Sequence, residues 1–212
     1  MSSSDEFGDS RHIVVVARRD LSLAFVNTLG MRGSLPAESL HDWRSVIEWT
    51  GAAKAMPERA ASRMHKWFTA NKAEAAKVFD QTIGLRETIY RLMHAAAEGT
   101  MPTADDLREF NRALAEAPAR VTLVHAEEGF GWRIGLEPSA AGLLAPVLWS
   151  AADILTGPDR ARVRECANDQ CLWLFLDDSK NGTRRWCSMQ VCGNRAKAHR
   201  HYLLQKKNGG GA

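Results

Sequence analysis

Four cysteines near the C-terminal end are the residues whose spacing most clearly indicates chemistry. They form two pairs with four residues inside each pair and fifteen residues between the pairs: Cys166, Cys171, Cys187 and Cys192. Paired thiolates at this spacing suit a tetrahedral zinc site, because each pair supplies one edge of the tetrahedron. Four thiolates leave no open coordination position. The sequence therefore predicts one structural Zn²⁺ rather than a catalytic metal.

Other uses of these cysteines fit the pattern less well. An iron–sulfur cluster also takes four thiolates, but paired spacing around a hairpin is more typical of zinc than of ferredoxin-type runs. Two disulfides would need an oxidising compartment, for which nothing in the sequence argues. His199 and His201 could replace a cysteine ligand, but four thiolates already suffice, and we expect both histidines to face solvent or phosphate.

The residues between the cysteines indicate how the pairs are held. Residues 172–176 form a strand-like apolar run, and residues 177–183 have turn composition, so we expect a hairpin that returns through residues 184–186 to Cys187. Gly193 and Asn194 are then expected to make a tight turn before a helix from Arg195 to Leu204. The turn that carries the first cysteine pair, the hairpin and the helix together predict a treble-clef-like module.

Positive charge is concentrated in the same segment. From Asp159 onward there are 11 Lys+Arg against 5 Asp+Glu, whereas residues 1–158 carry 17 against 20. A polyanion is therefore expected to bind at the cysteine-bearing end. The candidates for contacts with nucleic-acid phosphates or base edges are Arg184, Arg185, Arg195, Lys197 and Arg200. Because Arg195 starts the predicted helix, it is the candidate for reading a base, although it could instead hydrogen-bond to Asp177 or Asp178 inside the module.

Elsewhere, apolar residues recur mostly at helical spacing. The first such sets are Leu21, Phe25 and Leu29, then Leu40, Trp43 and Ile47, then Met64, Trp67 and Phe68. A helix can begin after Pro57, a longer one is predicted over residues 72–98 with Gly99 at its end, and Thr103 can cap the next.

The pattern then changes to alternation with period two around residues 127–129, which predicts one β-hairpin. Ser139 can cap a last helix that reaches Leu155, and Gly157-Pro158 marks the domain boundary. The fold class expected is mainly α with a small β-hairpin, built as a helical N-terminal domain plus a C-terminal treble-clef-like zinc module.

Four segments follow from these patterns. Residues 1–12 are expected to be disordered, 13–157 to form the mainly helical domain, 158–206 the zinc finger, and 207–212 a flexible tail. The helical domain is expected to fold without the zinc module, since apolar burial would stabilise it. No apolar stretch is long enough to cross a membrane, and the N-terminus lacks an apolar signal region, so we predict a soluble cytoplasmic protein without a membrane partner.

Two parts of the chain resemble known families. The run from Arg164 to Asp177, the Arg185-Trp-Cys-Ser-Met segment and Cys192-Gly-Asn-Arg-Ala-Lys together resemble the CGNR zinc finger. Residues 21–28, Leu-Ser-Leu-Ala-Phe-Val-Asn-Thr, are similar to the opening of the ABATE domain that precedes this finger, with Ala24 where an acidic residue is expected. The resemblance implies a stress-induced transcriptional regulator.

The function we predict is transcriptional regulation through nucleic acid, with DNA favoured, bound by the zinc module. The helical domain would sense a ligand or dimerise, with Asn27 and Thr28 lining the pocket or simply ending a helix. The alternative is a zinc-containing module that docks a protein. An enzyme is not expected: the sequence has no HExxH, P-loop, GxGxxG after a strand or Gly-x-Ser-x-Gly elbow, and its histidines are dispersed at His41, His65, His94 and His125.

Overall fold

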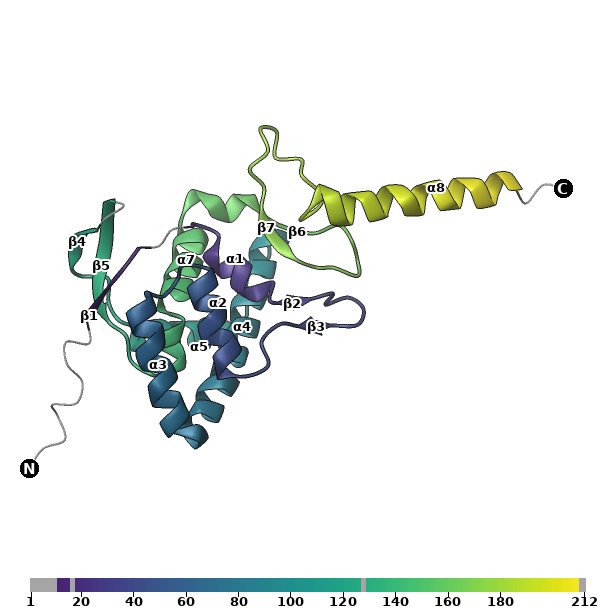
Figure 1. Ribbon diagram of the computed structural model, residues 1–212. Helices are drawn as coiled ribbons and strands as arrows, with labels where there is room; N and C mark the ends of the chain where they lie inside the picture. Colours follow the sequence, from purple (N-terminus) through teal and green to yellow (C-terminus); the bar gives the residue numbers. More distant parts are fainter. Residues whose placement is uncertain (1–10, 16–17, 127–128, 210–212) are drawn as a thin grey trace, which may run out of the picture.

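The computed structural model describes residues 11–15, 18–126 and 129–209, with the backbone alone for residues 11, 199–201, 203–204 and 207–209. Within these residues the chain is mainly helical, as predicted (Figure 1). The α-helices are α1 (Leu21–Val26), α2 (Trp43–Ala52), α3 (Glu58–Ala70), α4 (Lys72–Glu98), α5 (Ala104–Glu116), α6 (Ala140–Leu143), α7 (Ala145–Thr156) and α8 (Asn194–Gly209). A 3₁₀ segment, η1 (Pro158–Arg162), and a π-helical segment, η2 (Met189–Gly193), complete the helical elements.

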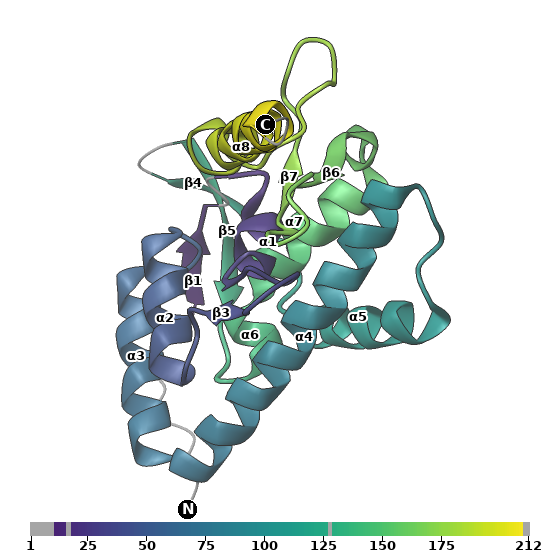
Figure 2. The ribbon, with the colours of Figure 1, turned by 90° about the vertical axis from the view of Figure 1, so that its right-hand side faces the viewer.

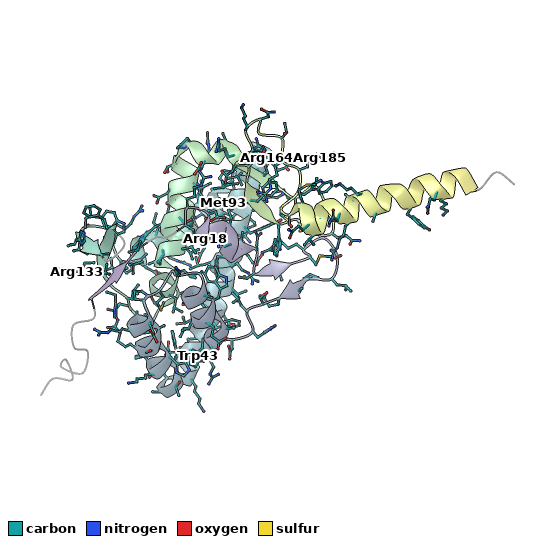
Figure 3. The ribbon with its side chains drawn as sticks, turned by 45° about the horizontal axis from the view of Figure 1, so that its top comes forward. Arg18, Trp43, Met93, Arg133, Arg164 and Arg185 are labelled. Carbon is teal, nitrogen blue, oxygen red and sulfur yellow. The ribbon has the colours of Figure 1, made fainter. Side chains whose placement is uncertain are left out.

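The long helix α4 forms the spine of the body and spans the predicted residues. It ends because Gly99 takes up the left-handed conformation at φ 67°, which costs glycine nothing. Its buried face includes Val78, Leu85 and Ile89 and packs against α1, α2, α3 and α7. Figure 2 shows α4 running along the full height of the body. Figure 3 places Met93 of this helix inside the body, with Arg133 and Arg185 toward opposite sides.

In the described part of the chain, three small antiparallel sheets accompany the helices. The predicted hairpin is confirmed as β4 (Leu123–Ala126) paired with β5 (Gly129–Gly135). A third strand, β1 (Arg11–Val14), pairs with the other edge of β5, so residues 11 and 12 belong to a sheet rather than to the disordered end predicted for residues 1–12. Residues 1–10 of that prediction lie outside the described chain.

The helix predicted from Ser139 is divided into two. Ser139 caps α6, as expected, by accepting a hydrogen bond from the Gly142 N–H at 3.0 Å. The helix is interrupted at Leu144 because Pro146 has no N–H to donate back to the preceding turn. The helical spacing predicts Leu29 in the same helix as Leu21 and Phe25, but Leu29 lies in β2 (Leu29–Gly30), paired with β3 (Ala37–Glu38).

The start of the predicted zinc finger is part of the main core. Strands β6 (Val163–Glu165) and β7 (Leu174–Leu176) pair with each other, and Val163, Leu174 and Leu176 are buried in the same apolar cluster as the helices. The boundary predicted at residue 157 thus falls where α7 ends, inside one continuous core, which argues against a helical domain that folds independently. Helix α8 continues to Gly209, into the segment predicted as a flexible tail, of which residues 210–212 lie outside the description. Among the described residues, none of the helices has the length and hydropathy needed to cross a membrane.

Candidate metal centre and the cavity beside it

The first cysteine pair lies in the turn between β6 and β7. Cys166 follows β6 directly, and its N–H donates to the carbonyl of Trp173 at 2.8 Å, which closes the hairpin around Cys171. The apolar run at residues 172–176 therefore pairs with the strand before the first cysteine. The sequence-based expectation that it would pair with residues 184–186 was wrong, because pairing with β6 buries Val163 in the main core beside Leu174 and Leu176, whereas Trp186 packs against the cysteine cluster.

The second pair is held by a helical turn. Cys187 follows an extended segment, and Cys192 lies in η2, which Ser188 caps by accepting from the Val191 N–H at 3.3 Å. The tight turn predicted at Gly193 and Asn194 is absent: Gly193 ends η2 and Asn194 begins α8. A side chain at Gly193 would meet the Met189 sulfur at 2.9 Å, so glycine allows this close packing.

The four sulfur atoms have the geometry of a zinc site. All four Sγ atoms lie within 4.8 Å of one another, and Sγ of Cys187 is 3.7 Å from Sγ of both Cys171 and Cys192. Zn–S bonds of about 2.3 Å in a tetrahedron require sulfurs about 3.8 Å apart, whereas a disulfide needs about 2.05 Å. The sulfurs therefore fit one zinc ion and no disulfide. When bound, that ion would be structural, because four cysteines fill its coordination sphere.

Neighbouring groups stabilise negative charge on the sulfurs. The Cys187 N–H donates to Sγ of Cys166 and the Asn168 side-chain amide to Sγ of Cys192, both at 3.5 Å. A hydrogen bond from Cys187 lowers the pKa of the Cys166 thiol to about 5. Burial raises the pKa of Cys171 to about 12, and a hydrogen bond to Cys166, followed by burial, raises that of Cys187. The cluster alone thus keeps protons that zinc would displace.

Two of the predicted basic residues lie against the metal centre. Arg184 donates through Nε to the carbonyl of Trp186 at 2.9 Å and through Nη2 to that of Cys187, with its guanidinium 4.5 Å above the Phe175 ring. Arg185 lies 5.4 Å from the centre of the Trp186 ring. Arg184 therefore also holds the loop that carries a zinc ligand.

The other candidates lie on α8. The Arg195 Nη1 group contacts Sδ of Met31 at 3.8 Å, and Lys197 is exposed. The bonds proposed from Arg195 to Asp177 or Asp178 are not formed: Asp177 accepts from Ser179 and from the Arg184 N–H, and Asp178 pairs with other arginines. The backbone of Arg200 belongs to α8, but its side chain lies outside the described residues.

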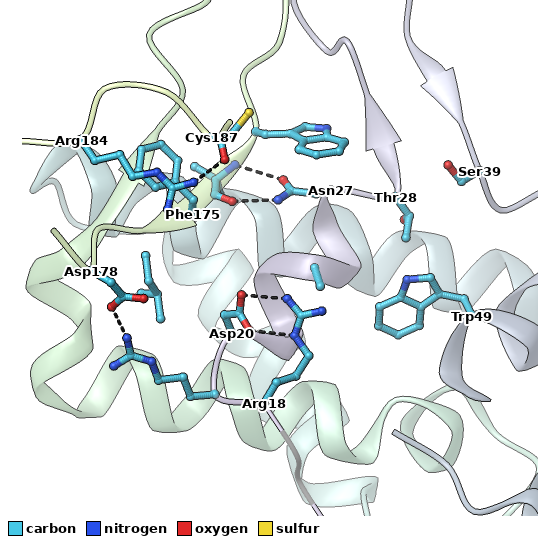
Figure 4. Close-up of a pocket in the computed structure, with 15 residues that line it drawn as sticks. Arg18, Asp20, Asn27, Thr28, Ser39, Trp49, Phe175, Asp178, Arg184 and Cys187 are labelled. Atoms are coloured by element: carbon cyan, nitrogen blue, oxygen red, sulfur yellow. Dashed lines mark hydrogen bonds and ion pairs between the residues drawn. The ribbon is translucent and has the colours of Figure 1, made fainter. Parts of the chain in front are cut away.

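Asn27 and Thr28 lie where α1 meets the zinc module. The Asn27 amide donates to the carbonyl of Leu174 at 2.8 Å and accepts from the N–H of the same residue at 3.0 Å. Thr28 donates to the carbonyl of Phe25 at 2.7 Å and accepts from Arg86 at 3.3 Å. Both residues line a cavity of about 580 Å³ (Figure 4). Asn27 thus fixes β7 to the helical body, a role that we did not predict.

A buried ion cluster lies behind Thr28. The Arg86 side chain is 2% exposed and forms two 2.7 Å hydrogen bonds to the carboxylate of Glu38 and a 2.9 Å bond to that of Glu87. Arg32 pairs with Glu87 at 2.7 Å and stacks 3.9 Å from the ring centre of Tyr90. Burial alone would raise the pKa of Glu38, but Arg86 and backbone N–H groups outweigh it and lower that pKa.

Tyr90 extends this cluster to the zinc module. Its hydroxyl lies 3.3 Å from both the Glu165 carboxylate and the carbonyl of Leu172, and His94 contacts the same carboxylate at 3.1 Å. Burial, followed by the negative charge of Glu165, raises the pKa of Tyr90 to about 12. Sequence patterns did not reveal these residues, because each pair is distant in the chain and no spacing signals it.

Comparison with known families matches both parts of the chain. Residues 19–158 match the ABATE family, described as "Putative stress-induced transcription regulator". Residues 162–203 match the CGNR zinc finger. A search of curated proteins finds no match. The two matched ranges meet near η1, the segment that joins α7 to the buried strand β6.

Proposed function

Since the chain belongs to the ABATE family and ends in a CGNR zinc finger, we propose that it is a transcription regulator that binds nucleic acid, with DNA favoured over RNA, through its zinc module. Both family matches support a regulatory zinc-binding protein. The proposal adds the polymer, the surface and the residues that bind it.

One observation carries this proposal. After Asp178 the sequence has eight Lys+Arg and no acidic residue up to its end. Part of this charge lies on α8, which projects from the body (Figure 1), with Arg195, Lys197 and Lys206 exposed along it. A cationic helix without neighbouring carboxylates attracts phosphates, and counterion release makes such binding strongly dependent on salt.

The zinc site gives this helix a fixed starting point. Cys192 lies two residues before Asn194, the first residue of α8, so the metal anchors the base of the helix. Sixteen residues span about 24 Å, and the major groove of B-DNA admits an α-helix. We propose that Arg195, at the anchored end, reaches base edges, while Lys197 and Arg185 contact phosphates.

The helical domain is proposed to regulate this binding by sensing a small molecule or by dimerising. A regulatory rather than catalytic role is supported by the closed four-cysteine site, which leaves no position for a substrate. It is also supported by the four histidines that could have served an active site, which lie on separate elements. His65 lies edge-on to Trp43 with ring centres 5.2 Å apart, His94 contacts Glu165, His125 lies on β4, and His41 precedes α2.

Docking of a protein partner is the second candidate. Met189 and Val191 are exposed large apolar residues on η2, immediately before α8. Exposed apolar residues beside a rigid zinc site favour a protein interface more than a phosphate contact. Under this alternative the cations would surround a protein-binding patch.

Titration separates the two candidates. Zinc-loaded protein is titrated by fluorescence anisotropy against duplex DNA and RNA of mixed sequence at two salt concentrations. We expect the logarithm of the binding constant to fall linearly with the logarithm of the salt concentration. The slope of this line should be smaller by about one unit in Lys197→Ala. Lys66→Ala, which removes an exposed lysine of α3, is the matched control and should not change the slope. Absence of binding to both polymers at low salt would reject the nucleic-acid proposal in favour of docking.

A further inference from the structure

We propose that the cavity between α1 and the zinc module binds a small aromatic carboxylate, and that the bound molecule alters how the zinc module is held against the helical body. This inference rests on the ligand-sensing part of the proposed function. It places the sensing site at the junction of the two parts rather than within the helices.

The walls of the cavity come from both parts of the chain. Ala24, Asn27 and Trp49 line it from the helical body, and Trp173 and Arg184 from the zinc module (Figure 4). Its volume of about 580 Å³ falls in the range of small-molecule sites. Any occupant of this size therefore contacts both parts at once.

The charges in the wall favour an anion. The two acidic residues that line the cavity are each paired with arginine: Asp20 with Arg18 at 2.8 Å, and Asp178 with Arg19. Arg184 also lines it, and the hydrogen bonds of its guanidinium go to backbone carbonyls, so this guanidinium forms no ion pair with a carboxylate among the described residues. A negatively charged ligand would supply the missing counter-charge.

Two arginines that line the cavity, Arg18 and Arg184, keep guanidinium donors in reserve for a ligand. Arg18 uses Nε and Nη2 on Asp20, and Arg184 uses Nε and Nη2 on carbonyls. The Nη1 group of each has no hydrogen-bond partner among the described residues. Guanidinium N–H groups bind carboxylates strongly. Ala24 leaves these donors without a carboxylate from the adjacent helix α1.

Aromatic rings form the remaining walls and favour a planar ligand. Trp49 packs against Phe25 with ring centres 5.1 Å apart, and Phe175 lies under the Arg184 guanidinium. Trp173 is 37% exposed, which is a large exposure for an indole ring next to a cavity. A flat aromatic ring could stack on these surfaces while its carboxylate meets the arginines.

Binding here would act on the zinc module through two contacts. Trp173 and Phe175 flank Leu174, the residue whose N–H and carbonyl are held by Asn27. Arg184 in turn holds the carbonyl of the zinc ligand Cys187, which also lines the cavity. A carboxylate that binds Arg184 would therefore change the hydrogen bonds by which Arg184 holds the loop that leads into η2 and α8.

Calorimetric titration of the zinc-loaded full-length protein tests the binding step. The probes are benzoate, 2-naphthoate, and the uncharged 2-naphthamide. We expect naphthoate to bind at least ten-fold more tightly than its amide, because only the acid supplies the counter-charge. Equal affinity for acid and amide, or no binding of either carboxylate up to about 10 mM, would overturn the proposal.

Variants locate the site. Arg18→Gln and Ala24→Asp should each weaken naphthoate at least ten-fold with unchanged zinc content, the first by removing a donor and the second by adding a competing carboxylate. Arg44→Gln is the control, since Arg44 stacks on Trp43 outside the cavity. Unchanged affinity in folded Ala24→Asp would place the ligand elsewhere and refute the assignment.

Hydrogen exchange tests the coupling. Naphthoate should change exchange of the amides from residue 174 to 192, and unchanged exchange at saturation would overturn the coupling. These measurements need no nucleic acid. If DNA binds and naphthoate does not, only this inference is rejected. If naphthoate binds and DNA does not, only the DNA-binding proposal is rejected.

Discussion

The two halves of the zinc module differ in what surrounds them. The first half, residues 163–178, contributes Val163, Leu174 and Leu176 to the main apolar core and is fixed by Asn27. The second half, residues 179–209, contains no acidic residue and ends in the projecting helix α8. Zinc joins them, since each half supplies one cysteine pair. One half thus serves as scaffold and the other as the exposed surface.

Truncation should have the largest effect on stability. If removal of the scaffold half did not destabilise the protein, the distinction between the two halves would be wrong. Ending the chain at Pro158 removes the three residues that the scaffold half contributes to the main core, each worth about 1.5–3 kcal/mol. We expect the free energy of unfolding to fall by more than about 4 kcal/mol, or the thermal transition to be lost. Ending it instead after Thr183 keeps β6 and β7 and should preserve a cooperative transition. Equal stability of the two truncated chains would contradict the shared core.

Acid should destabilise the helical body, because the buried ion cluster contains two carboxylates that must stay charged. The folded pKa of both Glu38 and Glu87 lies below the ordinary value of 4.5, because the bonds from arginine outweigh burial. Their contribution is therefore present above pH 4.5 and is lost as pH falls through the lowered values. Glu38→Gln should lower the free energy of unfolding by about 1.5–3 kcal/mol at pH 7. In this variant the free energy of unfolding should also fall less steeply as the pH drops below 4.5.

Denaturant titrations from pH 7 to pH 3 measure this effect. Glu109→Gln, on the exposed side of α5, serves as the control and should lose stability at low pH as the unaltered chain does. A Glu38→Gln variant with the same pH dependence as the unaltered chain would show that the buried cluster does not govern acid stability.

Loss of the Asn27 contact should have a smaller effect. Asn27→Ala leaves the Leu174 N–H and carbonyl without their side-chain partner, at a cost of about 1–3 kcal/mol. Amides of β7 should exchange faster, while zinc stays bound. Asn71→Ala removes an exposed amide that donates to the carbonyl of Trp67, and this change should cost less. If both variants lost the same stability, Asn27 would have no special role at the junction.

Much of this architecture could be predicted from local signals, and the rest depended on distant contacts. The bounds of α4, the caps at Thr103 and Ser139 and the zinc ligands follow from residue types at short spacing. The partner of β7 could not be inferred in this way, because both flanking segments have strand-compatible composition and only burial of Val163 decides between them. The cavity arises where α1 meets the module, about 150 residues apart in sequence, and no local pattern reports such a contact.

Arg195→Ala should have the smallest effect on the protein and the most specific effect on binding. Among the described residues the only hydrogen-bond partner of this side chain is Met31, so stability and zinc content should barely change. If Arg195 reads a guanine, its loss should cost about 1–3 kcal/mol on a preferred DNA site alone. Competition between preferred and mixed-sequence DNA measures this difference. A uniform loss across sequences would assign Arg195 to phosphate contact, and an unchanged affinity on every sequence would remove it from the interface.

Zinc dependence of DNA binding tests the central claim most directly. Anisotropy titration compares the zinc-loaded protein, the chelated protein and Cys187→Ser, with circular dichroism recorded on each sample. We expect the two zinc-free samples to keep the helical signal and cooperative unfolding of the scaffold half and body, and to lose DNA affinity at least ten-fold because α8 is no longer anchored. Equal DNA affinity with and without zinc, in protein whose metal content is confirmed by elemental analysis, would contradict the claim that zinc joins the buried scaffold to the binding surface.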